Sequence, residues 1–334
     1  MPRDDAPADI IALADARAEA RRARDWAAAD DLLARIGAAG WKVVDSGTMY
    51  DLVRAAAPDV AGDGIVRYGT SATVPSRLSE SPVGVASVVL VATDWPDDLA
   101  RAHRALVEHA PDGTQVVVVA NLPSDAQAAA LAGLDATDPG APGVTTEVVW
   151  TSQRLGWAAA LNAGIRRASA PVVILLDTSV EPAADLVTPL VSTLGDQAVG
   201  VAGPFGIVSR DLRRFDEAPA GTTDVDAIEG YLQAFRRADY DTRGPLDEHF
   251  VFYRNLDVWW SLVLRDQEEE APDGAPPRRA VRVGVPVTRH PHRGWASLPD
   301  DERDRLSRRN FYRVLKRFAT RRDLLVAGEK RDRA

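Results

Sequence analysis

The chain has 334 residues, of which 46% are hydrophobic, and it carries a formal net charge of −9. This length suits one large domain with a small one, and the negative charge excludes general binding of nucleic acid or membrane by the whole chain. The absence of cysteine excludes disulfides, thiolate metal sites and a cysteine nucleophile.

The first residues, MPRDDAPADI, lack the apolar segment of a secretory signal. No run of the sequence approaches the ~18 apolar residues of a membrane span. We therefore expect a cytoplasmic protein, and peripheral contact with the inner face of the membrane stays open.

Residues 9–37 are expected to form two short helices, because apolar residues in the second recur at helical spacing. The residues at this spacing are Trp26, Ala29, Leu33 and Ile36. Glycines at 37 and 40 favour a helix end, since glycine adopts left-handed backbone conformations easily. A short alternating stretch then begins at Trp41.

The same segment, within ARAEARRARDWAAADDLLARIGAAGWKVVDSGTMYDL, resembles the small C-terminal domain of cysteinyl-tRNA synthetases. The matching residues are Arg24, Asp25, Trp26, Ala29, Asp30, Gly40 and Asp45. The resemblance implies a helical module over 1–53 and leaves two partners open through residues 9–50. One is a protein that docks on the helices, and the other is RNA. The candidate RNA contacts are Arg17, Arg21, Arg22 and Arg24.

Residues 54–84 are rich in Gly, Pro, Ser and Thr and are expected to be a linker with one short strand at 64–68. From residue 86, short apolar runs alternate with segments of helical periodicity. The expected strands are 86–92, 115–120, 146–151, 172–177 and 198–202. The expected helices are 97–110, 124–134, 157–169 and 183–195. This order predicts an α/β fold with a mostly parallel, doubly wound sheet and flanking helices over 85–325.

The second half is less regular. We expect a loop and helix at 224–237, a long helix at 247–265, a strand of alternating valines at 280–288 and an amphipathic helix at 300–325. Residues 326–334 are expected to be a disordered tail.

The clearest functional signal is Asp177, which an apolar strand delivers at its carboxyl end. Ligands of open α/β sheets bind at that end of the strands. The surrounding RLGWAAALNAGIRRASAPVVILLD, together with SVVLVATDWPDDL before it and GPLDEHFVFYRNLDVWWSLVLRD after it, resembles family 2 glycosyltransferases. The resemblance spans about 86–318 and implies a GT-A-like fold.

It further implies transfer of a sugar from a nucleotide-diphosphate donor to a hydroxyl of a glycan or lipid-linked acceptor, with inversion and with Mg²⁺ or Mn²⁺ as cofactor. A cell-envelope glycan is the expected product. The implied donor-binding residues are Thr93, Asp94, Asn121, Arg154, Gly156, Asn162, Asp177 and Ser179. The implied acceptor-side residues are Glu229, Gly230 and Trp259. The implied metal ligands are Asp177, Ser179, His290 and His292.

The sequence departs from the family pattern at three acidic positions, which hold Ala120, Ser179 and Asn255. Asn255 occupies the place of the catalytic base, and an amide is no base, so Asp257, Asp247 and Glu248 are the remaining candidates. On a continuous helix, Asp257 would point about 160° away from position 255. A degenerate protein that binds without catalysing transfer is therefore the alternative.

Overall fold

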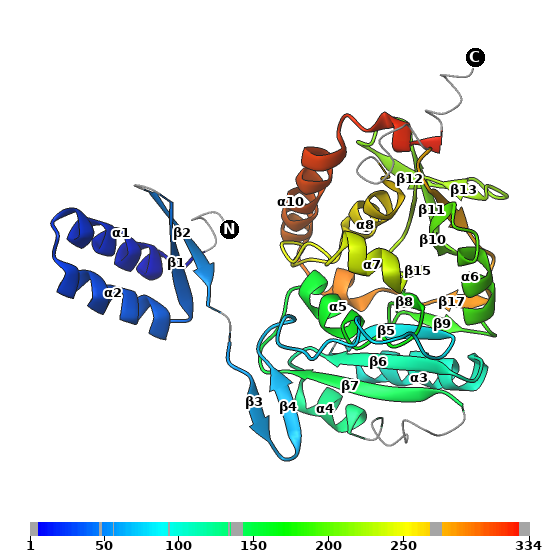
Figure 1. Cartoon of the computed structure of the whole chain (residues 1–334), viewed down its shortest axis with the longest axis horizontal. Helices are drawn as coiled ribbons and strands as arrows, with labels where there is room; N and C mark the ends of the chain where they lie inside the picture. Colours follow the sequence, from blue (N-terminus) through cyan, green and yellow to red (C-terminus); the bar gives the residue numbers. More distant parts are fainter. Residues whose placement is uncertain are drawn as a thin grey trace. The chain divides into compact units, whose positions relative to one another are not determined.

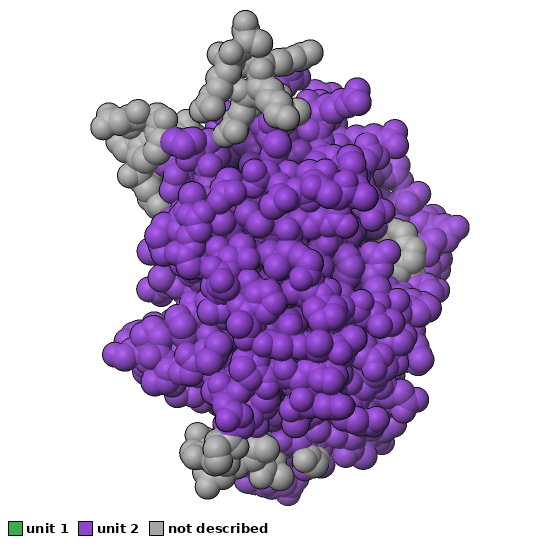
Figure 2. All heavy atoms as spheres, turned by 90° about the vertical axis from the view of Figure 1, so that its right-hand side faces the viewer, with its two compact units in different colours: residues 1–60 green, residues 61–334 purple. Residues whose placement is uncertain are grey.

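The computed structural model of this chain divides into two compact units, Met1–Val60 and Ala61–Ala334, and we describe each by itself. The described residues are 6–46, 49–55, 57–92, 94–132, 134, 143–267 and 276–326. Figure 2 shows one face of the larger unit in purple. The tail at 327–334 and Thr93 lie outside the described residues.

The smaller unit consists of two helices followed by a β-hairpin (Figure 1). Its elements are α1 (Ala8–Arg22), α2 (Trp26–Ala38), β1 (Trp41–Ser46) and β2 (Met49–Arg54). Asp25 caps α2 by accepting a hydrogen bond from the backbone N–H of Ala28 at 3.0 Å. Both predicted helices are confirmed. The predicted apolar stripe is only half buried, since Ala29 and Ile36 enter the core while Trp26 stays 59% exposed.

Two of the arginines predicted as RNA contacts are held within the smaller unit. The guanidinium of Arg17 is buried and donates two hydrogen bonds of 3.0 Å to the two carboxylate oxygens of Asp45. Arg21 pairs with the same carboxylate. This bidentate ion pair joins α1 to β1, so Arg17 and Asp45 have a structural role in the smaller unit.

The units divide at residues 60 and 61, so most of the expected linker at 54–84 belongs to the larger unit. Within it, β3 (Val60–Gly62) and β4 (Ile65–Tyr68) are strands, and β4 pairs in parallel with β7 (Thr145–Thr151). The backbone N–H of Val83 donates to the carbonyl of Ser169 at 2.9 Å. Residues 61–84 are thus part of the larger unit, held by backbone hydrogen bonds that leave no periodic signal in the sequence.

A ten-stranded sheet forms the centre of the larger unit (Figure 1). Its order is β13-β16-β10-β15-β8-β5-β6-β7-β4-β3. The strands not yet given are β5 (Ala86–Ala92), β6 (Thr114–Ala120), β8 (Val172–Leu176), β10 (Val199–Gly203), β13 (Asp224–Val225), β15 (Leu232–Arg236) and β16 (Arg279–Arg282). β8, β5, β6, β7 and β4 run in parallel, whereas β15 is antiparallel to both its neighbours. The predicted mostly parallel sheet is confirmed.

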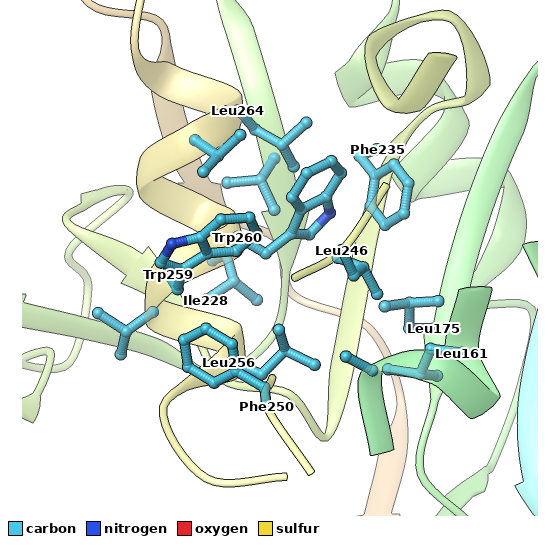
Figure 3. Packing of buried hydrophobic residues seen from close by; sticks show 14 of the residues in the cluster. Leu161, Leu175, Ile228, Phe235, Leu246, Phe250, Leu256, Trp259, Trp260 and Leu264 are labelled. Atoms are coloured by element: carbon cyan, nitrogen blue, oxygen red, sulfur yellow. The ribbon is translucent and has the colours of Figure 1, made fainter. Parts of the chain in front are cut away.

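Helices cover both faces of this sheet, in keeping with the complete burial of the central strands β5, β6 and β8. One face packs on α3 (Pro96–His109), α4 (Asp125–Leu131) and α6 (Val187–Leu194). The other packs on α5 (Trp157–Ile165), α8 (Leu256–Arg265) and α10 (Asp300–Phe318). Figure 3 shows Trp260 of α8 beside Phe235 of β15 in this second core, and their ring centroids lie 5.4 Å apart.

Glycine is required where α5 approaches the sheet. A Cβ atom at Gly164 would lie 2.5 Å from Val89 Cγ1 and 2.9 Å from Val119 Cγ2. Because Gly164 has no side chain, α5 can pack directly on β5 and β6.

Three expectations for the second half are wrong. Residues 224–237 contain β13, β14 (Ala227–Ile228) and β15 in place of a helix, because the run at 232–236 is buried inside the sheet. The long helix expected at 247–265 begins only at Leu256, since Asn255 has a left-handed backbone with φ of 67°. The single strand expected at 280–288 is two strands, β16 and β17 (Val287–Arg289), which pair in different sheets.

The remaining elements lie around the edges of the large sheet. β9 (Val180–Pro182) pairs with β17, and β11 (Gly206–Ser209) pairs with β12 (Phe215–Glu217) and with β14. α7 (Arg237–Arg243), the short α9 (Arg293–Ala296) and a 3₁₀ turn at Arg322–Leu324 complete the fold. Within the described ranges, no helix is both long and apolar enough to cross a bilayer.

Candidate functional site

A cavity of about 870 Å³ opens at the carboxyl end of β8. Its polar wall combines groups from four separate segments of the chain. These groups are Asp177, Glu229, Tyr231, Tyr253, Asp257 and His292. Such convergence of titratable side chains at the carboxyl end of a sheet is typical of a ligand site in an α/β protein.

Asp177 follows β8 directly and is held in place from three directions. Its backbone N–H donates to the carbonyl of Tyr231 at 3.0 Å, which fixes the end of β8 to the start of β15. One carboxylate oxygen accepts from the backbone N–H and the hydroxyl of Ser179 at 2.8 and 2.5 Å. The other lies 3.3 Å from Nε2 of His292. Ser179 thus orients Asp177 where the family pattern has a second carboxylate.

The charges of Asp177 and His292 stabilise one another. Burial raises the pKa of Asp177, but the hydrogen bonds from His292 and Ser179 outweigh it and hold that pKa below its ordinary value. Burial lowers the pKa of His292, and the neighbouring Asp177 carboxylate more than reverses this effect and raises it. The two side chains are 8% and 14% exposed, so solvent screens their interaction little.

Two tyrosines fix the His292 ring. The ring of Tyr253 lies 4.5 Å from it between centroids, and that of Tyr231 makes an edge contact at 6.0 Å. His290 takes a different direction, since its Nε2 lies 2.7 Å from the carboxylate of Glu181. The two histidines expected to act together therefore have separate carboxylate partners.

The donor set of this site fits a divalent cation only in part. Among the residues that the structure describes, no group of three or more His, Cys, Asp or Glu side chains could hold a metal ion. Of the four expected ligands, Ser179 and His292 both lie beside Asp177, the Ser179 hydroxyl as a donor to that carboxylate, whereas His290 is directed to Glu181. The Asp177 carboxylate suits a Mn²⁺ or Mg²⁺ ion that takes its other oxygen ligands from substrate phosphates and water, and His292 would join it only as a neutral imidazole that has left its ion pair with Asp177.

Asp257 lies in the cavity wall because α8 begins one residue before it. Its two oxygens accept hydrogen bonds from the backbone N–H groups of Gly230 and Val258, both at 2.9 Å. Burial nonetheless raises its pKa. Burial and the neighbouring Asp257 also raise the pKa of Glu229. The site therefore places two carboxyl groups of elevated basicity side by side.

The left-handed residue before α8 decides which carboxylate faces the cavity. Asn255 is outside the helix, so the expected 160° separation of positions 255 and 257 does not apply. The Asn255 amide donates to the carbonyl of Ser307 at 3.0 Å and joins α8 to α10. Asp247 is absent from the cavity lining, and its carboxylate contacts His249 at 2.6 Å and Arg313 at 3.2 Å. Glu248 is also absent from the lining and accepts from the Asn162 amide at 3.0 Å, so Asp257 is the one candidate base that lines the cavity.

The aromatic side chains are distributed differently from the expectation. Trp259 is absent from the cavity lining and packs on Phe250 and beneath the guanidinium of Arg317, with centroid distances of 5.6 and 5.7 Å. Trp157 lines the cavity and makes an edge contact with Tyr253 at 6.0 Å. Gly230 lines the cavity and donates its backbone N–H to Asp257.

Several residues expected to bind the donor are occupied in holding the fold. Asp94 pairs with Arg154 at 2.8 Å. The amide of Asn121 donates to the carbonyl of Leu155 at 3.0 Å and accepts from its N–H at 2.7 Å. These residues lie outside the cavity lining, as do Gly156 and Asn162.

Asn162 is buried and positions the segment that follows α7. Its amide donates to the Leu246 carbonyl at 2.9 Å and accepts from the Leu246 N–H at 3.0 Å and the Tyr240 hydroxyl at 2.8 Å. The carbonyls of Phe250 and Val251 in turn accept hydrogen bonds from the first N–H groups of α5. Asn162 thus acts on the site through the segment that carries Tyr253.

Sequence reasoning missed Tyr231, Tyr253 and four arginines of the cavity wall, at 213, 214, 254 and 308. Nothing in the sequence marks the tyrosines, since they lie in irregular segments whose placement depends on tertiary packing. The arginines are scattered among many others, so their convergence is visible only in three dimensions.

Comparison with known proteins agrees with this architecture. The family described as Glycosyl transferase family 2 matches residues 87–224. No curated protein matches the chain. Similar solved structures include GalNAc-T7 with UDP, GalNAc and Mn²⁺, at 16% identity and a TM-score of 0.51 over 70% of this chain and 48% of that one.

Another is the mannosyltransferase PcManGT from Pyrobaculum calidifontis in complex with GDP-Man and Mn²⁺. It is 20% identical, with a TM-score of 0.45 over 63% of this chain and 57% of that one. The chain thus spans about half the length of these two proteins. The segment at 9–52 that resembles a synthetase domain lies outside the family match, and that resemblance stays a prediction. The larger unit of this chain has the GT-A fold, and its residues 87–224 match glycosyl transferase family 2.

Proposed function

We propose that the larger unit transfers a glycosyl group from a nucleotide-diphosphate sugar to a hydroxyl acceptor. The observation that carries this proposal is the cavity at the end of β8, where Asp177 and His292 face the carboxyl groups of Glu229 and Asp257. The family match over 87–224 supports the same reaction class.

In this proposal, Asp257 is the general base. It takes the proton of the acceptor hydroxyl while that oxygen attacks the anomeric carbon of the donor sugar. The bond from that carbon to the diphosphate oxygen breaks, and the electron pair leaves with the nucleoside diphosphate. Attack opposite the leaving group inverts the anomeric configuration. A carboxylate whose pKa is raised by burial suits this role, because a stronger base accepts the proton more readily.

The leaving-group side lies at the end of β8. Asp177 and His292 are the residues that would hold a divalent cation, and such a cation supplies positive charge for the departing diphosphate. Tyr231 and Tyr253 keep the His292 ring in place. Glu229, beside Asp257, faces the same space as a second acceptor-side group. A glycan or lipid-linked acceptor of the cell envelope is the substrate class we propose.

A second candidate is binding of the donor without transfer. It is favoured by the three changed acidic positions and by the Asp94–Arg154 ion pair, which occupies two residues expected at the nucleotide. The two candidates differ in turnover, since only the first releases nucleoside diphosphate in the presence of an acceptor.

The first test is a thermal-shift panel of UDP-, GDP- and dTDP-sugars, with and without Mn²⁺. A donor at 100 times its Kd stabilises the native state by about 2.7 kcal/mol, which is roughly 5 °C for a domain of this size. We expect one donor to give a metal-dependent shift that Asp177→Asn abolishes. The exposed Asp97→Asn is the matched control and should keep the shift. No shift with any donor would refute the proposal.

A further inference from the structure

The cavity wall carries more positive charge than the proposed transfer chemistry uses. Arg213 and Arg214 enter it from the turn between β11 and β12, Arg254 precedes α8, and Arg308 belongs to α10. The three segments are distant in sequence and meet only here. Three carboxyl groups line the same cavity, and one of them, Asp177, is already paired with His292.

These arginines fall into two groups by their neighbours. Arg254 lies close enough to Glu229 and Asp257 to oppose the rise of both their pKa values, so it belongs to the acidic end of the cavity. Arg213, Arg214 and Arg308 are exposed, and we call them the arginine rim. Arg214 forms an exposed ion pair with Asp216 at 3.0 Å. Arg308 donates a hydrogen bond from Nε to the backbone carbonyl of Asp304.

Arg308 of the rim lies on the acceptor side of the cavity. The Ser307 carbonyl, next to Arg308, accepts from Asn255 at the start of α8, the helix that carries Asp257. Asp177 and His292, which mark the leaving-group side, sit at the end of β8. Phe215 and Phe311 line the cavity next to the rim, so its charges border an apolar surface.

We propose that the acceptor carries an oxyanion, a phosphate or a carboxylate, which the arginine rim binds while the acceptor hydroxyl faces Asp257. This inference rests on the proposed function. A guanidinium presents paired donors that match two oxygens of such a group, and its charge makes each hydrogen bond stronger than a neutral one. Arg214 is paired with Asp216, so Arg213 and Arg308 supply the main positive charge for an anion bound at the rim.

The test uses three probes that share one sugar ring, namely glucose 6-phosphate, glucuronate and neutral glucose. Their binding to the full chain is measured by titration calorimetry at constant ionic strength. The variants are Arg213→Ala with Arg308→Ala in one chain, and Arg305→Ala as the control. Arg305 lies on the same helix α10, is 62% exposed, and is absent from the cavity lining.

We expect a charged probe to bind the native chain at least tenfold more tightly than glucose. We expect the double variant to lose about tenfold or more of that affinity, since a hydrogen bond to a charged group contributes about 1.5–3 kcal/mol. Arg305→Ala should bind like the native chain. Preference for glucose 6-phosphate would identify a phosphorylated acceptor, and preference for glucuronate a carboxylated one.

Two results would overturn the inference. One is equal or absent binding of all three probes. The other is loss of UDP or GDP binding in the double variant with no effect on the charged sugars, which would assign the rim to the donor. The proposed function can fail independently of this inference. Binding of the charged probes through the rim, without binding of any nucleotide sugar, would support the oxyanion site and refute the transferase.

Discussion

Replacing Asn162 by leucine should destabilise the larger unit strongly, although position 162 lies outside the cavity. The buried amide satisfies both the N–H and the carbonyl of Leu246 and also accepts from the Tyr240 hydroxyl. Leucine has nearly the same size but no hydrogen-bonding atoms. Each buried polar group left without a partner costs about 1–3 kcal/mol, so the two Leu246 groups alone predict a loss of about 2–6 kcal/mol.

The assay is urea unfolding of the full chain followed by tryptophan fluorescence. Tyr240→Phe is the matched control, because it removes one of the same hydrogen bonds and leaves the Leu246 groups paired. Its expected cost is about 1 kcal/mol. If Asn162→Leu costs no more than Tyr240→Phe, then Asn162 is not what holds the segment after α7, and the structural role assigned to it is wrong.

Three further predictions concern other positions. Asn121→Asp puts a carboxylate next to the changed acidic position Ala120 but should destabilise the fold by about 1–3 kcal/mol, because an acid oxygen would replace the amide donor that faces the Leu155 carbonyl; a gain in stability would contradict the role of Asn121. Gly164→Val should lower the melting temperature markedly or prevent folding, since its Cβ alone meets Val89 at 2.5 Å, whereas the open position Gly62, where no atom lies within 4 Å of an added Cβ, should accept alanine with little change. The hydrogen bond from Arg17 lowers the pKa of Asp45 below its ordinary 3.8, so this pair stabilises the smaller unit above that pH and the stabilisation is lost as the pH falls below it. Asp45→Asn should remove this part of the pH dependence of unfolding, followed by circular dichroism. The same loss of stability at acid pH in the variant would contradict the prediction.

The order of buried strands and helices was predictable because apolar runs of strand length alternate with helical periodicity along residues 86–203. The antiparallel strand β15 was not, since the five-residue segment LQAFR fits either a strand or a helix and only its place between β8 and β10 decides. The start of α8 could not be predicted either, because it depends on the left-handed backbone conformation of Asn255.

Only Asp177 and His292 of the candidate site were predictable from the sequence. Asp177 follows from a strand that ends in a carboxylate, and His292 from the resemblance. The orientation of Asp257 depends on the backbone at Asn255, which composition and spacing do not determine. Asn121 and Asn162 were expected to bind the donor, but both side chains satisfy buried backbone groups, so the resemblance did not determine their contacts.

The most direct test of the account is the rate of nucleoside diphosphate release from the donor that stabilises the chain, compared between Asp257→Asn and Asp247→Asn. Asparagine keeps an oxygen that can accept from the Gly230 N–H but is no base. The account predicts that Asp257→Asn lowers kcat by about 10²–10⁴-fold with little change in the KM for the donor, while Asp247→Asn keeps most of the activity. Turnover by Asp257→Asn at the native rate, or no turnover by the native chain with a donor that binds, would contradict it.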